Sequence, residues 1–399
     1  MESVMINKIK LQLMVSSLLL MAHFAFAETS TAVKIGLIST LSGPGAALGV
    51  DIRDGFQLAV KIADGKLGGI NAEIIVADDQ ASPESGRQAA ERMVKQNKID
   101  FMTGIVFSNV LLAVGPPTFQ SKTFYISANA GPSQYAGEQC NAYFFSASYQ
   151  NDNIHEAAGQ VVTEKGFKNV AVIAPNYPAG KDAINGFKRF YKGEIASESL
   201  PALNQLNFGT EIAQLRASKA DAVYIFLPGG MGVNFIKQFV AAGLSKDMTL
   251  IGPGFSGDED VIKAVGDPML GMFNTTQWAH DMDNAANKKF VSAFEKEYGR
   301  LPTLYAAQGY EAAQLIGAAI RDSKGNLDDK TAVRKALMAA KFDSVRGSFK
   351  FNTNHFPIQN YYLRIIAKDS KGRITNRLIG GAVLKNHGDV YASTCKMSD

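Results

Sequence analysis

Short apolar runs alternate with amphipathic stretches along most of this chain, and the two patterns predict different elements. Runs rich in β-branched and aromatic residues predict buried strands, whereas apolar residues spaced near a 3.6-residue period predict helices. The first such unit joins a strand at residues 33–39 to a helix at about residues 50–64. Further strands are expected at residues 72–77, 100–104 and 123–127, with a helix from Pro83 to about Gln96.

The alternation restarts at Asn169, after the polar segment at residues 149–153. The second series predicts strands at residues 170–174, 221–226 and 249–251, and helices that end near Tyr191, Ala242 and Val265. Strands that alternate with helices of this length form right-handed βαβ units around mostly parallel sheets. Two separate series therefore predict two doubly wound lobes rather than one long sheet.

The loops that follow these strands are the expected ligand-binding segments, because ligands of parallel sheets bind at the carboxyl ends of the strands. They are rich in glycine and poor in charge, which suits backbone N–H groups that bind a carboxylate. The loops span residues 42–48, 107–109, 129–131, 176–179, 228–231 and 252–257.

The first 27 residues have the pattern of a secretory signal. Lys8 and Lys10 precede an apolar run that ends in Ala25-Phe26-Ala27, an A-x-A cleavage site. We expect cleavage near Ala27 and a periplasmic mature protein. No later stretch approaches the roughly 20 apolar residues that a membrane-spanning helix needs.

Length and charge restrict the function further. The chain exceeds the roughly 250 to 300 residues at which one hydrophobic core stops growing, so two domains are expected. It carries 41 Lys and Arg against 37 Asp and Glu, a net charge of only +4. No cluster of basic residues is interleaved with aromatic residues, which argues against a nucleic-acid partner.

Cys140 and Cys395 are the only two cysteines of the sequence. Oxidation is the default outside the cytosol, so we predict a disulfide that ties the C-terminal tail to the loop before Cys140. Two buried free thiols are the alternative. A metal site is not expected, because no histidine or second cysteine lies at ligand spacing from either residue.

No motif predicts catalysis or a cofactor. Residues 252–257 satisfy G-x-G-x-x-G, but the window about 20 residues on holds Trp278 where a dinucleotide site needs an acidic residue. Ser256 is one residue short of a G-x-S-x-G nucleophile motif. The histidines show no H-E-x-x-H or other paired-ligand spacing. We therefore expect neither an enzyme nor a bound cofactor.

Three segments carry a resemblance to a known family. They read VKIGLISTLSGPGAALGVDIRDGFQLAV, GLSKDMTLIGPG and LPTLYAAQGYEAAQLIGAA. In this order and spacing they resemble the periplasmic branched-chain amino-acid-binding proteins of ABC transporters, and the resemblance spans essentially the whole mature chain. It implies the type I periplasmic-binding-protein fold, an α/β fold of two Rossmann-like lobes with mostly parallel sheets.

The resemblance also implies how the chain divides. Three crossovers between the lobes are expected near Gln150, Trp278 and Asn354. Residues 28–149 and 279–354 would then form lobe I, after the signal peptide at residues 1–27. Residues 150–278 and 355–399 would form lobe II and the C-terminal tail.

Single positions refine the expected ligand. By resemblance, Ser108 matches the family serine that binds the substrate carboxylate, whereas Gly131 replaces a threonine. Gly254 replaces the glutamate that pairs with the substrate ammonium, and Leu48 and Pro228 replace two tyrosines. A buried ammonium without a partner costs several kcal/mol, so an α-amino acid becomes a poor candidate. The segment ISANAGPSQYAGEQCNAYFFSASYQND resembles the subfamily that binds aromatic carboxylates.

The expected ligand site combines these positions with residues of the strand-end loops. Trp278 is either a pocket residue or a core residue, and Asn129 and Gln308 either bind a ring hydroxyl or cap the neighbouring backbone. The candidate binding residues are Ser42, Leu48, Phe107, Ser108, Asn129, Ala130, Gly131, Tyr177, Pro228, Gly254, Phe255, Trp278, Tyr305 and Gln308.

Together these features predict the solute-binding component of an ABC importer. We expect it to be a monomer that closes its lobes around a small carboxylate, aromatic and without an α-amino group, and then docks on the permease subunits. Binding of branched-chain or other amino acids is one alternative. A ligand sensor that feeds a signalling partner is another.

Overall fold

The structure of the protein, a computed structural model, describes residues 32–397. The expected signal peptide at residues 1–27 lies outside this part of the chain. Among the described residues, no helix is both long and apolar enough to cross a membrane.

The first sheet has six strands in the order β2-β3-β1-β4-β5-β6. Strands β1, β4, β5 and β6 run parallel, and β1 also pairs in parallel with β3, whereas β2 and β3 form an antiparallel hairpin. Their bounds are β1 Val33–Ser39, β2 Lys66–Leu67, β3 Ile70–Asp78, β4 Phe101–Thr103, β5 Phe124–Ser127 and β6 Phe144–Ser146.

The second sheet has eight strands in the order β12-β13-β11-β10-β9-β7-β8, with β14 paired to β13. The five strands from β11 to β8 run parallel, and β12, β13 and β14 add an antiparallel edge. Their bounds are β7 Asn169–Ile173, β8 Glu194–Ser199, β9 Ala222–Ile225, β10 Thr249–Pro253, β11 Phe273–Thr276, β12 Lys350–Phe351, β13 Pro357–Lys368 and β14 Ile374–His387.

Helices connect the strands of both sheets. They are α2 Ala46–Ile62, α3 Pro83–Arg92, η2 Met93–Asn97, α4 Ser108–Gln120, α5 Ser133–Ala136, α6 Asn151–Glu164, α7 Pro178–Phe190, α8 Gly209–Ser218, α9 Gly230–Ala241, η3 Leu244–Lys246, η4 Gly254–Ser256, α10 Glu259–Val265, η5 Asp267–Met269, α11 Ala285–Tyr298, α12 Leu304–Asp322, α13 Lys330–Ala339 and η6 Ala392–Thr394.

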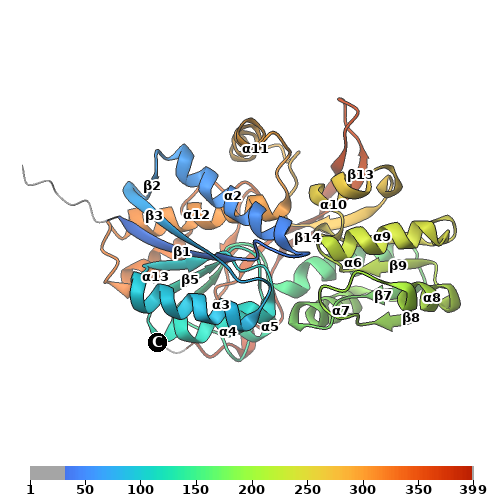
Figure 1. Ribbon diagram of the computed structural model, residues 1–399, viewed down its shortest axis with the longest axis horizontal. Helices are drawn as coiled ribbons and strands as arrows, with labels where there is room; N and C mark the ends of the chain where they lie inside the picture. The colour runs from blue at the N-terminus through green and yellow to red at the C-terminus, as the bar shows by residue number, and fades with distance from the viewer. Residues whose placement is uncertain (1–31, 398–399) are drawn as a thin grey trace, which may run out of the picture. The chain divides into compact units, whose positions relative to one another are not determined.

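Helices α2 and α12 lie side by side although about 250 residues of sequence separate them (Figure 1). Two glycines permit this close packing. A Cβ atom on Gly55 would lie 1.9 Å from the carbonyl oxygen of Ala306, and one on Gly309 would lie 2.0 Å from that of Ile52. Any larger residue at either position would force the two helices apart.

The chain crosses between the two lobes more than once. The chain passes from β6 of the first sheet to α6 and β7 of the second, returns after β11, and enters the second sheet again at β12. The α/β fold with two lobes of mostly parallel strands is therefore confirmed. Strand β12 pairs with β13, so residues 350–351 belong to the second sheet, whereas the expected first lobe reached residue 354.

The sequence patterns located some strands and missed others. Strand β1 has the predicted bounds, but the helix expected from Pro83 to Gln96 ends at Arg92 and continues as one π-helical turn, η2. The short buried strands β6 and β11 were not predicted. Strands β8, β13 and β14 were also missed, and many of their residues are half-buried or exposed, so their apolar pattern is weak.

Candidate functional site

A small cavity lies at the carboxyl ends of strands from both sheets. Ser108 and Asn129 reach it from the segments after β4 and β5, and Tyr177 and Phe255 reach it from those after β7 and β10. The position agrees with the rule that parallel sheets bind ligands at their strand ends. The lining residues are Val106, Phe107, Ser108, Asn129, Tyr149, Tyr177, Ala179, Phe226, Pro228, Phe255 and Tyr305.

Six aromatic side chains dominate the wall, and each contacts the next. The ring of Phe107 meets Tyr177 edge-on at a centroid distance of 6.1 Å, and Tyr177 stacks on Phe226 at 6.4 Å. Phe226 then meets Phe255 at 6.3 Å. Phe255 in turn contacts Tyr149 at 5.2 Å and Tyr305 at 5.3 Å. Such a wall suits a flat apolar ligand, because aromatic rings offer a large contact area at a low entropy cost.

Two helix N-termini supply hydrogen-bond donors at the cavity. Ser108 is the first residue of α4, and Ala179 is the second residue of α7. The backbone N–H groups of the first turn have no partner within a helix, and the helix dipole places positive charge there. No charged side chain of residues 32–397 lines the cavity. The electrostatic environment therefore favours an anionic group and offers no partner to a cation.

Neutral polar groups complete the wall. The Asn129 side chain donates from Nδ2 to the Val106 carbonyl at 2.7 Å, while its buried Oδ1 has no partner within the described chain. Burial raises the pKa of the hydroxyls of Tyr149, Tyr177 and Tyr305, so these groups stay protonated. The cavity thus keeps neutral donors and acceptors beside its rings.

Ser108 belongs to a hydrogen-bond network behind the cavity. Its Oγ accepts from Asn151 Nδ2 at 3.2 Å, and the same Nδ2 donates to Asp182 Oδ2 at 2.9 Å. Asp182 also accepts from the backbone N–H of Ser133 at 3.1 Å and from its hydroxyl at 2.7 Å. Burial raises the pKa of Asp182, and these donors oppose that shift. The network joins residues that follow strands of both sheets.

The model of the periplasmic binding protein family matches residues 32–371. The chain belongs to the periplasmic binding protein family. It is a periplasmic solute-binding protein of an ABC transporter, a class that binds small molecules and docks on permease components. The family and the type I fold are those of substrate-binding proteins and not of enzymes.

Curated relatives and solved structures agree with this assignment. The chain is 28% identical to the Leu/Ile/Val-binding protein homolog 6 of Brucella melitensis, over 90% of this chain and 93% of the relative. An ABC transporter solute-binding protein from R. palustris in complex with benzoate has a TM-score of 0.86 at 32% identity, covering 92% and 99% of the two chains. A second, from Rhodopseudomonas palustris BisB5 in complex with 3,4-dihydroxybenzoic acid, has a TM-score of 0.81 at 29% identity, covering 89% and 98%.

Half of the candidate residues of this binding protein lie together in the cavity. They are Phe107, Ser108, Asn129, Tyr177, Pro228, Phe255 and Tyr305. Four further lining residues, Val106, Tyr149, Ala179 and Phe226, were not among the candidates, although Ala179 lies in the expected binding loop at residues 176–179. Phe226 directly follows β9, and Tyr149 lies three residues after the end of β6. At such positions an aromatic residue cannot be told from a core residue by pattern alone.

Four other candidates lie outside the cavity. Ser42 is exposed, and Leu48 is buried against Gly229. Gly131 donates its N–H to Asn151 Oδ1 at 3.0 Å, and Ala130 donates to the Ile105 carbonyl at 3.5 Å. These two backbone groups are therefore used inside the protein. The N–H groups of Ala130 and Gly131 are therefore not free to bind a ligand carboxylate, as was expected for the backbone of residues 129–131.

Gly254 also stays outside the cavity. A Cβ atom at this position would lie 2.9 Å from Nη2 of Arg364 and 3.2 Å from a methyl group of Leu304. A side chain here would therefore point toward a buried guanidinium group. The cavity lacks a partner for an ammonium ion because none of its lining side chains is charged, and residue 254 does not decide this.

Trp278 and Gln308 line a separate small chamber. Trp278 donates from Nε1 to Asn287 Oδ1 at 2.8 Å and packs edge-on against Phe290. These contacts agree with the alternative that Trp278 is a core residue. Both amide atoms of Gln308 are buried without a partner among the described residues. Neither side chain lines the aromatic cavity.

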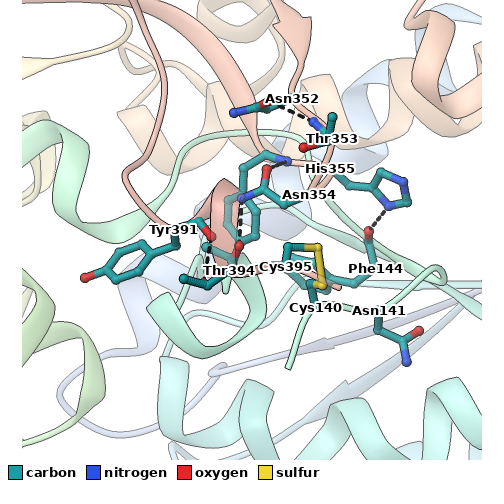
Figure 2. The surroundings of a disulfide bond; sticks show 12 residues. Cys140, Asn141, Phe144, Asn352, Thr353, Asn354, His355, Tyr391, Thr394 and Cys395 are labelled. Carbon is teal, nitrogen blue, oxygen red and sulfur yellow. Dashed lines mark hydrogen bonds between the residues drawn. A yellow bond between two sulfur atoms is a disulfide. The ribbon is translucent and has the colours of Figure 1, made fainter. Parts of the chain in front are cut away.

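The predicted disulfide between Cys140 and Cys395 is confirmed, with a Cα–Cα distance of 5.6 Å (Figure 2). It ties the C-terminal tail to the loop between α5 and β6. The tail is held further by Tyr391, whose hydroxyl donates to Asp152 Oδ2 at 2.8 Å. Within residues 32–397, no group of three or more His, Cys, Asp or Glu side chains is placed to hold a metal ion.

Proposed function

We propose that this solute-binding protein binds a small aromatic carboxylate that lacks an α-amino group, enclosed between its two lobes as they close. One observation carries the proposal. The cavity combines six aromatic rings and two helix N-termini with no charged side chain from the described residues. The rings suit a planar apolar body, and the helix N-termini suit a carboxylate.

In this arrangement Ser108 binds the carboxylate together with the first backbone N–H groups of α4. The rings of Tyr177, Phe226 and Phe255 contact the ligand ring. Asn129 Oδ1 accepts a hydrogen bond from a ring hydroxyl where the ligand carries one, because this buried oxygen has no partner among residues 32–397.

An α-amino acid fits the same cavity poorly. Its ammonium would be buried without a carboxylate partner, because Asp182 is separated from the cavity by Asn151 and accepts three hydrogen bonds inside the network. Loss of a charge-assisted hydrogen bond costs about 1.5 to 3 kcal/mol, which lowers affinity at least tenfold. The structural neighbours solved with benzoate and with 3,4-dihydroxybenzoic acid support the same ligand class.

Isothermal titration calorimetry tests the proposal on the purified mature protein. We expect benzoate or a hydroxybenzoate to bind and leucine to give no heat. Ser108→Ala is expected to weaken benzoate binding by about tenfold to a hundredfold, through the lost hydrogen bond to the carboxylate.

Ser42→Ala is the matched control, because Ser42 is exposed and lies outside the cavity. It is expected to leave the dissociation constant unchanged. Tight binding of leucine or valine without a response to any benzoate would overturn the proposal in favour of an amino-acid binder.

A further inference from the structure

We propose that Asp182 is a positioning residue that orients Asn151 and so keeps the Ser108 hydroxyl hydrogen free to donate to the ligand. This inference rests on the proposed function, in which Ser108 binds a carboxylate. Asp182 itself does not line the cavity.

The orientation of the Asn151 amide is fixed from both sides. Its Oδ1 accepts from the backbone N–H of Gly131 at 3.0 Å, and that group can only donate. Its Nδ2 faces the Asp182 carboxylate at 2.9 Å, which when ionised can only accept. If the Asn151 amide were turned over, its NH₂ group would face the N–H of Gly131, and its oxygen would face the carboxylate of Asp182. Both contacts would be repulsive.

The amide orientation determines what Ser108 can do. Asn151 Nδ2 donates its second hydrogen to Ser108 Oγ at 3.2 Å. Because this donor faces one of the two acceptor lone pairs of the hydroxyl, the Ser108 O–H does not point at Asn151 and is left to donate elsewhere, and the residue lines the cavity. Ser108 therefore presents a donor, which a carboxylate can accept with either of its oxygens and a carboxamide with only one.

The same carboxylate also connects the two lobes. Asp182 lies on α7, between β7 and β8 of the second sheet, whereas Ser133 begins α5, after β5 of the first sheet. Ser133 donates to both carboxylate oxygens, from its hydroxyl to Oδ1 and from its N–H to Oδ2. Separation of the lobes would break these contacts. The direction of the Ser108 hydroxyl is thus coupled to closure.

The test compares binding of benzoate and benzamide, which share a ring and differ in whether the polar group can donate. The wild-type protein is expected to prefer benzoate. In Asp182→Asn the side-chain amide can donate to Asn151, the fixed orientation is lost, and the preference for benzoate should fall about tenfold.

Two further variants separate positioning from a structural role. Ser133→Ala removes a lobe contact without changing what faces Asn151, so it should weaken both ligands equally and keep their ratio. In a Ser108→Ala background, Asp182→Asn should no longer change the ratio. Should Asp182→Asn fail to fold, as judged by circular dichroism, Asn151→Ala makes the same prediction for Ser108.

The outcomes distinguish the two proposals. A wild-type protein that does not bind benzoate would overturn the proposed function together with this inference. Benzoate binding with an unchanged benzoate-to-benzamide ratio in folded Asp182→Asn would overturn the inference alone. The inference would also be overturned if Asp182→Asn changed the benzoate-to-benzamide ratio equally in the wild-type and Ser108→Ala backgrounds.

Discussion

Arg346 and Glu311 form an ion pair in which both side chains are almost fully buried. The Arg346 guanidinium also donates to the carbonyl groups of Ala147 and Ser148 and to the Gln359 side chain. Ala147 and Ser148 lie where the chain passes from the first sheet to the second, and Arg346 lies where it passes back before β12. The pair therefore holds two interlobe crossovers against α12.

Removal of one partner should be costly. Glu311→Gln leaves the Arg346 charge buried without its counter-ion, and such a change destabilises proteins by about 3 to 5 kcal/mol. Urea unfolding followed by circular dichroism measures the loss. The control is Asp283→Asn, which breaks an exposed ion pair with Lys288 and should cause no measurable change. Equal stability of the two variants would contradict the role given to the buried pair.

Loss of the disulfide should loosen the C-terminal tail. Cys140 and Cys395 are 255 residues apart, and a bond that closes a loop of this length restricts the unfolded chain strongly. The double variant Cys140→Ser/Cys395→Ser is expected to lose about 2 to 5 kcal/mol of unfolding free energy. Urea unfolding with and without a reducing agent checks this. A reducing agent that destabilises the double variant as much as the wild type would argue against the disulfide as the cause.

Substitution of Phe255 should weaken aromatic ligands selectively, because its ring contacts three other rings of the cavity. Aromatic contacts contribute about 0.5 to 1.5 kcal/mol beyond buried area, so Phe255→Leu is expected to lower benzoate affinity about two- to tenfold. Cyclohexanecarboxylate, which lacks a π system, should lose less. Phe239→Leu, in the core around α9, is the control and should leave both affinities unchanged.

His155 should make the fold sensitive to acid. The ring is fully buried against Tyr224, and burial lowers the pKa of His155 to about 3, against about 6.5 in an unfolded chain. Between these values only the unfolded state binds the extra proton. The free energy of unfolding therefore falls as the pH falls, by up to about 1.4 kcal/mol per pH unit from this group.

The variant His155→Gln isolates this contribution. Burial raises the pKa of Asp152 to about 6 and that of Asp260 to about 7, and both groups act in the opposite direction. The pH dependence of the unfolding free energy of the wild type is thus a sum over several groups. The difference in this dependence between wild type and variant comes from residue 155. Denaturant unfolding at pH 7 and pH 5 should show a smaller loss in the variant. Parallel pH profiles would contradict the assignment.

The sequence predicted the parts of the site that depend on local pattern. Ser108 follows a buried strand and begins a helix, and Tyr177 and Phe255 lie in the segments just after β7 and β10, so the rule that ligands bind at strand ends finds them. Phe226 also follows its strand directly, but nothing local separates it from the apolar run before it. Whether Phe226 lines the cavity depends on whether its side chain points toward the other lobe.

Contacts between distant residues could not be predicted in this way. The Gly131 N–H was expected to bind the ligand, and in the structure Asn151 accepts it. Asp182 reaches the same asparagine from 31 residues further along the chain. No periodicity relates these positions, because the packing of two lobes brings them together. The hydrogen-bond network behind Ser108 therefore depends on the three-dimensional packing and does not follow from the sequence pattern.

The position of Trp278 gives the protein a natural fluorophore for the motion of its crossovers. It is the only tryptophan of the sequence, and its indole lies in the chamber with Ser148 and Arg346 rather than in the aromatic cavity. A change in its emission on ligand addition would therefore arise from rearrangement of the crossovers and not from contact with the ligand. Stopped-flow fluorescence could then time the closing step separately from the binding heat, with no label attached.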